Sequence, residues 1–217
     1  MVSAEDDPRR AGTIWVLNLD EPAPVVAPLV AATFCQVGSE SARAVGTAMG
    51  GDTTGEVLRR FETGRRCYSA WVEGELASYG WVSIEEEFVG EMHLRLWLLP
   101  GEAYIWDCAT VPILRRQSLY SALLSYILQE LRGEKLCRVW IGADMDNLAS
   151  QRGIARAGFH YVADLVVEQV LPLRMAWVQG RPGVPEKLVA EARRVFLGNR
   201  DQVWLDAVSL ATAQTNE

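Results

Sequence analysis

The sequence has no apolar run near the length of a membrane-spanning helix, and it has only two histidines. These two, His93 and His160, are not spaced as metal ligands. Basic residues are outnumbered, because 21 Lys and Arg against 28 Asp and Glu give a net charge of −7, whereas nucleic-acid binders show a basic face. The opening residues, MVSAEDDPRRAG, lack the apolar core of a secretory signal. We therefore expect a cytoplasmic protein that uses no metal, nucleic acid or membrane.

Paired cysteines and a glycine-rich dinucleotide motif are also missing. The four cysteines show no CxxC spacing, which favours small buried hydrophobic residues in a reducing compartment; they are Cys35, Cys67, Cys108 and Cys137. No GxGxxG follows the first apolar strand, so a typical dinucleotide-binding fold is excluded. With 217 residues, of which 49% are apolar and 23% charged, the chain suits one soluble domain.

The first half of the chain reads mainly as antiparallel strands. Apolar and alternating patterns predict strands over Thr13–Leu19, Arg66–Val72, Leu76–Ile84 and His93–Leu99. The middle two form a hairpin, because Gly74 after Glu73 supplies a tight turn. A buried helix is predicted over Ala27–Phe34, a loop with little helix over Gly38–Thr54, and an amphipathic helix over Gly55–Thr63.

The second half contains a strand–helix–strand unit. Ala103–Val111 and Leu136–Ala143 are apolar strands, and the helix between them carries an apolar stripe with Gly133 near its end. Such a unit is a parallel crossover. Further predicted elements are a helix over Leu148–Ala157, strands over Phe159–Gln169 and Arg174–Val178, a helix between Pro185 and Gly198, and a short helix through Ala213. The fold class is therefore α+β.

The turn VPILRRQSLY, from Val111 to Tyr120, joins the first crossover strand to its helix. A helix N-terminus offers unpaired N–H groups, here those of Gln117, Ser118, Leu119 and Tyr120, together with a partial positive charge. Arg115 and Arg116 add charge, and arginine binds phosphate with two hydrogen bonds. Solvated arginines before an ordinary helix would explain the same residues. The turn therefore indicates a phosphate site without establishing one.

Two longer stretches, AYIWDCATVPILRRQSLYSALLSYIL and RVWIGADMDNLASQRGIARAGFHYV, resemble the core of the GNAT superfamily of acyl-CoA N-acyltransferases. The first resembles its V-x-P turn followed by an arginine and glycines. The second resembles its N-x-x-S helix motif, with Asn147, Ser150 and the pair Gly158-Phe159 in register. The resemblance covers residues 103–162 well, extends plausibly over 13–178, and leaves out residues 179–217. It divides the chain into a tail (1–12), a GNAT-like domain (13–178) and a helical C-terminal extension (179–217).

The resemblance implies a mixed sheet whose two crossover strands splay, with the pantetheine arm of acyl-CoA in the gap. The resemblance implies three sets of cofactor contacts. The main chain of Cys108 and Thr110 would pair with the pantetheine arm, and Asn147 with Ser150 would lie near the same arm. The pyrophosphate cradle would consist of Arg115, Arg116, Gln117, Ser118, Leu119, Tyr120 and Ser121. Asn147 could equally be a plain helix cap.

The pyrophosphate motif is degenerate. Ser118 and Tyr120 stand where two small residues are usual, so the cradle is expected to be weakened but not lost. Ser118 in a helical conformation would keep its N–H and add a hydroxyl. The Tyr120 side chain could point away from the phosphate, or lie over the arm and narrow the cleft.

The chemical step requires groups that move protons. Ile154 occupies the place of the tyrosine acid that many family members carry. Asp107, the acid within Ala103–Val111, is the candidate base, and in that apolar run it should have either a raised pKa or a partner. The alternative is an acid without a catalytic role, at a solvent-facing strand position or paired with an arginine. Glu85–Glu87 could form an acidic substrate mouth, a solvated face or a bulge.

These observations predict an N-acyltransferase that moves an acyl group from acetyl-CoA, or another acyl-CoA, to a small amine. The alternatives are a catalytically silent domain of the same fold that binds CoA or a partner protein, and an interaction role for the C-terminal helices. A homodimer also stays open.

Overall fold

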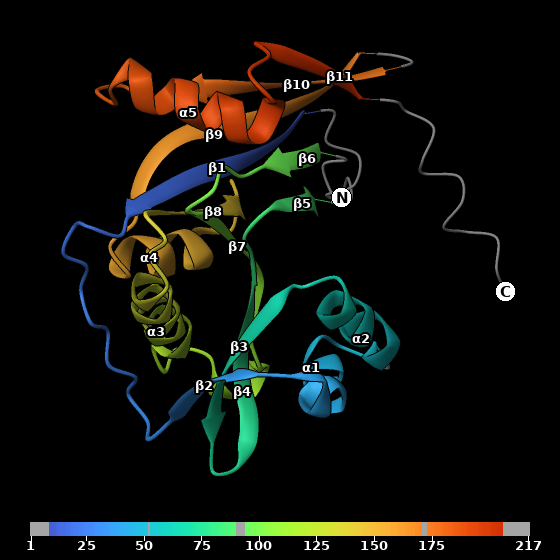
Figure 1. Cartoon of the computed structure of the whole chain (residues 1–217), viewed down its shortest axis with the longest axis vertical. Coiled ribbons are helices and arrows are strands. Elements are labelled where there is room, and N and C mark those ends of the chain that lie inside the picture. The colour runs from blue at the N-terminus through green and yellow to red at the C-terminus, as the bar shows by residue number, and fades with distance from the viewer. Residues whose placement is uncertain (1–8, 52, 90–93, 171–172, 206–217) are drawn as a thin grey trace, which may run out of the picture.

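The computed structural model describes residues 9–51, 53–89, 94–170 and 173–205, and within them nine strands form one mixed sheet (Figure 1). The strand order is β11-β10-β9-β1-β8-β7-β4-β3-β2. The bounds are β1 Arg9–Asn18, β2 Thr33–Val37, β3 Arg66–Val72, β4 Glu75–Ser83, β7 Glu102–Thr110, β8 Arg138–Asp144, β9 His160–Val170, β10 Leu173–Gly180 and β11 Gln202–Leu205. A separate hairpin pairs β5 (Glu86–Val89) with β6 (Leu94–Trp97). The predicted fold class is confirmed: of the described pairs in the large sheet, β7 with β8 is parallel and the others are antiparallel.

Helices cover both faces of the sheet (Figure 1). Their bounds are α1 Ala42–Ala48, α2 Thr54–Glu62, α3 Leu119–Gly133, α4 Leu148–Arg156 and α5 Glu186–Leu197. Helices α3 and α4 pack on one face, while α1 and α2 pack on the other face near β3 and β4. Helix α5 shares that second face with the β5–β6 hairpin, over β1, β8 and β9. No helix in the described part of the chain is long and apolar enough to cross a membrane.

The predicted crossover forms because α3 has one continuous apolar stripe. Leu123 and Ile127, one turn apart, are fully buried against the sheet face that carries Ile105 of β7 and Val139 of β8. On the opposite face of the same strands, Tyr104 and Trp140 alternate with these residues and pack under α5. Burial on both faces holds β7 and β8 in the centre of the sheet.

The predicted hairpin is also present. Glu73 and Gly74 join β3 to β4, and both have positive φ, 52° and 84°. Two consecutive residues with positive φ make the tight turn whose twist matches the two strands. The α2 helix and the Gly158 stop after α4 likewise lie where the pattern placed them.

The predicted helix over Ala27–Phe34 is wrong. The chain from Glu21 to Ala32 is irregular and crosses α3, where the Leu29 N–H donates to the Gln117 carbonyl (2.9 Å) and the Ser125 hydroxyl donates to the Pro24 carbonyl (3.1 Å). Phe34 already belongs to β2. Hydrogen bonds to a neighbouring element have replaced the bonds that a helix would make.

Other differences concern boundaries and the C-terminal residues. Gly38–Thr54, expected to be mostly loop, contains α1, and β1 begins at Arg9, inside the expected tail. The short helix expected after Gly198 is wrong for Gln202–Leu205, because these residues form β11 and pair with β10. The rest of that predicted helix, through Ala213, lies outside the described residues. His93, the first residue of the predicted strand His93–Leu99, also lies outside them. Lys135, not Gly133, takes the left-handed conformation after α3.

Candidate active site

Strands β7 and β8 pair along only the first part of their length. The parallel register runs from Glu102 opposite Arg138 to Ile105 opposite Ile141 and then stops. A cavity of about 820 Å³ opens at this point. Its walls include, from the two strands, Trp106, Asp107 and Cys108 of β7 and Gly142, Ala143 and Asp144 of β8. The splayed strands predicted from the family resemblance are therefore present.

A β-bulge in β7 sets the directions of its side chains at the cavity. Tyr79 of β4 lies opposite Ala109 and Trp81 lies opposite Trp106, so Gly80 faces two residues, Asp107 and Cys108. Asp107 has a φ of 41°, which re-aims its side chain towards the α2 face. Cys108 turns to the α3 face and packs so closely that its Sγ would lie 2.8 Å from a Cβ on Gly80.

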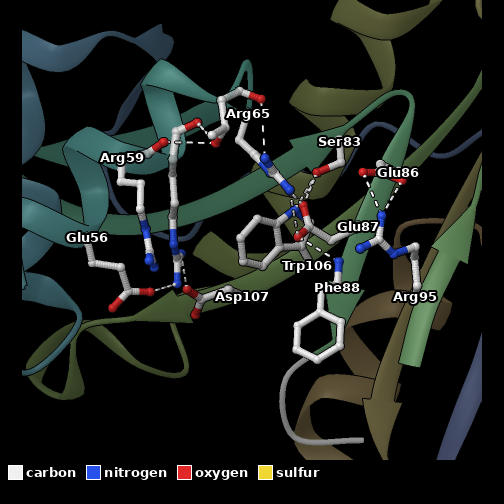
Figure 2. Close-up of polar contacts among 12 residues, drawn as sticks. Glu56, Arg59, Arg65, Ser83, Glu86, Glu87, Phe88, Arg95, Trp106 and Asp107 are labelled. Atoms are coloured by element: carbon white, nitrogen blue, oxygen red, sulfur yellow. Dashed lines mark hydrogen bonds and ion pairs between the residues drawn. The ribbon is translucent and has the colours of Figure 1, made fainter. Parts of the chain in front are cut away.

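Asp107 is paired with an arginine, as the alternative without a catalytic role expects, and this pairing leaves its role as a base a prediction. Its carboxylate forms an ion pair with Arg60 of α2 and accepts a longer hydrogen bond from the Tyr79 hydroxyl (3.4 Å). Arg60 also forms an ion pair with Glu56 (2.6 Å), so one guanidinium contacts two carboxylates. Figure 2 shows those of Glu56 and Asp107 approaching each other. Burial lowers the pKa of Arg60, but its bonds to Asp107 and Glu56 outweigh that effect and raise it overall.

Arg60 is held between the two carboxylates by stacking on tryptophans. Its guanidinium lies 4.6 Å from the centre of the Trp106 ring and 5.1 Å from that of Trp81. An arginine over an indole face is favourable, more so where the pair is shielded from water. The charge facing Asp107 is therefore fixed in place by packing as well as by ion pairing.

The turn after β7 keeps a glycine-like backbone although it has no glycine. Arg116 and Ser118 have φ of 66° and 58°. The expectation that Ser118 would be helical is therefore wrong: it is the left-handed cap residue just before α3, and its hydroxyl accepts a bond from Arg156 (3.0 Å) instead of pointing to a free ligand site. The left-handed conformation costs a residue with a side chain about 1–2 kcal/mol. The backbone conformation of this turn is therefore strained at Arg116 and Ser118.

The backbone donors of this turn are open. Among the described residues, the N–H groups of Gln117, Ser118, Leu119 and Tyr120 have no protein acceptor. Arg115 and Arg116 are exposed, and Arg115 is steadied by a bond from its Nε to the Thr110 carbonyl (3.3 Å). Alternating left-handed residues next to a helix start turn successive N–H groups towards one point, which suits an anion.

The remaining residues of the predicted cradle have mainly structural surroundings. The Leu119 side chain is buried against Ala70 and Ala77, and Ser121 is buried beside Gly153. Thr110 bonds the Ser78 hydroxyl (3.0 Å). These residues can contribute backbone groups to a ligand, whereas their side chains serve packing.

Tyr120 points into the cleft, not away from it. It lines the cavity, and its hydroxyl lies 3.1 Å from the Ser150 hydroxyl on α4. Its ring takes the space of a side chain on Gly153, where a Cβ would lie 2.4 Å from the tyrosine ring. Burial raises the pKa of Tyr120, as it does that of the Cys108 thiol. The cleft is therefore narrower than small residues at this position would make it.

Asn147 is a helix cap. Its Oδ1 accepts a bond from the Ser150 N–H (3.0 Å) at the start of α4. The side chain is exposed and lines the cavity, and its amide N–H₂ has no hydrogen-bond acceptor among the described residues. The two functions considered for Asn147 are compatible in this geometry.

Glu87 lines the cavity, and the sequence did not distinguish it from the adjacent Glu85 and Glu86. It is only 5% exposed and binds the Ser83 hydroxyl, the Arg65 guanidinium (3.1 Å) and the Phe88 N–H (2.9 Å), as Figure 2 shows. Ser83 in turn accepts a bond from the Trp106 indole (2.9 Å). Glu86 beside it is exposed and pairs with Arg95, so Glu85–Glu87 is not a uniform acidic mouth. Alternation along β5 was the signal available for this difference.

The structure thus brings five predicted residues to one cavity: Asp107, Cys108, Tyr120, Asn147 and Ser150. The turn with the open N–H groups lies beside them at the start of α3, from which Tyr120 projects. Charged side chains of α2 and the following loop, Glu56, Arg59, Arg60 and Arg65, line the cavity as well.

Comparisons with known proteins agree with this arrangement. The model of the acetyltransferase (GNAT) family matches residues 39–159. A GNAT-family acetyltransferase from Colwellia psychrerythraea superposes with a TM-score of 0.53 at 15% identity over 79% of this chain and 56% of its own. A GCN5-related N-acetyltransferase from Sphaerobacter thermophilus gives 0.53 at 15% identity, over 72% of this chain and 50% of its own.

These two structural matches show a shared fold, and the chain spans about half of each matched protein. No curated protein matches the sequence significantly. The family model, in contrast, covers more than half of the chain, including the turn, the crossover and the Asn147 helix. The chain belongs to the GNAT family of acetyltransferases.

Proposed function

We propose that this chain is an N-acyltransferase that moves an acyl group, acetyl in the first instance, from acyl-CoA to an amine. The observation that carries the proposal is the parting of β7 from β8 beside a turn with open N–H groups. Acetyl-CoA is the co-substrate of the GNAT family. A long thin thioester with a pyrophosphate needs both an open strand edge and an anion cradle, and the parted strands beside the open N–H groups support this proposal.

The residues present fit acyl-CoA. Beyond Ile105, the β8-facing edge of β7 has no strand partner in the described part of the chain and can pair with an amide-containing arm. Asn147 offers its amide N–H₂ from the opposite wall. Residues 116–121 offer backbone donors to pyrophosphate, supported by the charges of Arg115 and Arg116. The loss of glycine has not closed this cradle, because the backbone keeps its left-handed form.

Asp107 is proposed as the group that takes the proton from the attacking amine. A carboxylate can accept a proton, and that of Asp107 lines the cavity where it pairs with Arg60. The bulge turns Asp107 towards α2, so the amine is expected to enter from the α2 side. The approach of an amine then competes with Arg60 for the carboxylate.

Calorimetric titration with acetyl-CoA and with CoA tests the cofactor, and release of CoA thiol with a panel of amines tests the transfer. Binding and amine-dependent thiol release are expected. The absence of binding would overturn the proposal as a whole. Binding without release above the buffer rate would favour the alternative, a silent GNAT-fold domain that binds CoA.

A further inference from the structure

Acyl transfer to an amine needs a proton donor as well as a base, since the thiol of CoA leaves as a poorly stabilised anion. The following inference rests on the proposed function. Two phenol hydroxyls line the cavity, those of Tyr104 and Tyr120. They come from different elements, β7 and the first turn of α3. Their surroundings decide which one can donate.

Tyr120 is placed in the cleft by a specific accommodation on the neighbouring helix. Gly153 lies inside α4, where glycine costs about 0.5–1 kcal/mol relative to alanine. A Cβ at this position would meet the Tyr120 ring at 2.4 Å and 2.7 Å. The glycine therefore provides the room that the tyrosine ring occupies between α3 and α4. The ring reaches across to Ser150 with its hydroxyl instead of turning to solvent.

We propose that Tyr120 is the catalytic acid of this site. In the transfer step the amine nitrogen bonds the acyl carbon, the carbon–sulfur bond breaks, and its electron pair goes to sulfur. The Tyr120 hydroxyl gives its proton to that sulfur, while Asp107 takes the proton lost by the amine. Tyr120 regains a proton through the Ser150 hydroxyl, so the products are the amide and the free thiol.

The environment keeps Tyr120 able to donate. Burial raises the pKa of its hydroxyl, which keeps the phenol protonated at neutral pH but makes it a weaker acid than an exposed tyrosine, so donation depends on direct contact with the sulfur. Ser150 is partly exposed and bonds the phenol directly, which gives a path for proton return. Tyr104 lies deeper, because it is only 6% exposed and packs edge-on against Phe196 in the core under α5.

Replacing the hydroxyl alone tests the proposal. Tyr120→Phe should lower kcat with acetyl-CoA by about 100-fold, with little change in the Kd of acetyl-CoA. Tyr126→Phe is the matched control, because it removes a phenol hydroxyl from the same helix at a position outside the cavity lining, and it should retain the parent kcat. Equal losses in both variants would show a packing effect and overturn the proposal. A loss in Tyr104→Phe but not in Tyr120→Phe would also overturn it.

A second measurement does not depend on turnover. A phenol that donates to sulfur stabilises the thiolate, so the thiol of CoA bound to the parent protein should have a pKa lower by about one pH unit than in Tyr120→Phe. Ultraviolet absorbance of the thiolate during a pH titration of the saturated complex measures this difference. Identical titrations would overturn the contact even if no amine substrate were found. A parent protein that binds CoA but shows no amine-dependent thiol release would overturn the proposed function, while the titration would still report on Tyr120.

Discussion

The two sides of the cavity differ in what they present to a ligand. The side proposed for the cofactor, formed by the edge of β7 beyond Ile105 and the turn before α3, presents mainly backbone groups, and the N–H groups of residues 117–120 have no protein acceptor among the described residues. The acceptor side, formed by α2, β4 and β5, presents side chains that are already paired. Arg60 bridges two carboxylates there, and Glu87 has three kinds of donor.

One side can recognise a ligand through its backbone conformation, and the other through the identity of its side chains. Backbone groups depend little on side-chain identity, so the cofactor side tolerates serine and tyrosine in place of small residues. The acceptor side depends on each partner, because a charge left without its partner in a shielded site is costly. Substitutions should therefore have larger effects on the acceptor side than on the cofactor side.

The largest effect is expected at Glu87. Glu87→Ala leaves Arg65 and Ser83 without their buried acceptor and should lower the free energy of unfolding by about 3 kcal/mol. Chemical denaturation measures the loss. Glu86→Ala is the matched control on the same strand, since its pair with Arg95 is exposed and worth at most about 1 kcal/mol. Equal changes in the two variants would contradict a buried anchor on the acceptor side.

The next effect concerns catalysis. Asp107→Asn keeps the size of the side chain but removes its capacity to take a proton, so turnover should fall by about 100-fold. The affinity for acetyl-CoA should not change, because Asp107 faces α2. Thiol release and calorimetry on the same sample measure the two quantities. Unchanged turnover would remove Asp107 as the base.

Local patterns were sufficient to predict most of the elements around the site. The α3 stripe, the Glu73-Gly74 turn and the Asn147 cap each depend on residues a few positions apart. The helix predicted over Ala27–Phe34 was wrong because Leu29 within it and Val26 just before it bond Gln117 and Ser125, about 90–100 residues away in the chain. Apolar composition alone could not reveal those partners.

The same reasoning explains which parts of the site were not foreseen. The bulge at Asp107 arises from the register between β4 and β7, and neither strand encodes it alone. Glu87 is buried through Arg65, 22 positions earlier. Ile154 at the usual tyrosine position suggested that a proton donor was missing, whereas Tyr120 reaches the cleft from another helix because Gly153 makes room. The replacement of a tyrosine on α4 by one on α3 can be recognised only from the packing of the two helices.

A moderate effect is expected from the charges of the cofactor side. The double variant Arg115→Ala, Arg116→Ala should weaken CoA binding by about 10-fold, the value of one charge-assisted hydrogen bond. Binding of pantetheine, which lacks the pyrophosphate, should be unaffected. Calorimetry with both ligands checks this, and Lys187→Ala on α5 controls for a lost surface charge. Equal weakening for both ligands would place the arginines away from the pyrophosphate.

The smallest effect concerns the left-handed backbone of the turn. Ser118 has a φ of 58°, a conformation that glycine adopts freely and that strains a residue with a Cβ. Ser118→Gly and Ser118→Ala both remove the hydroxyl that accepts from Arg156, so the difference between them isolates the backbone. Ser118→Gly should be more stable than Ser118→Ala by about 1 kcal/mol, measured by denaturation. If Ser118→Ala were as stable as Ser118→Gly, the backbone at position 118 would not be strained. The open N–H groups of the turn could then not be attributed to a strained left-handed backbone.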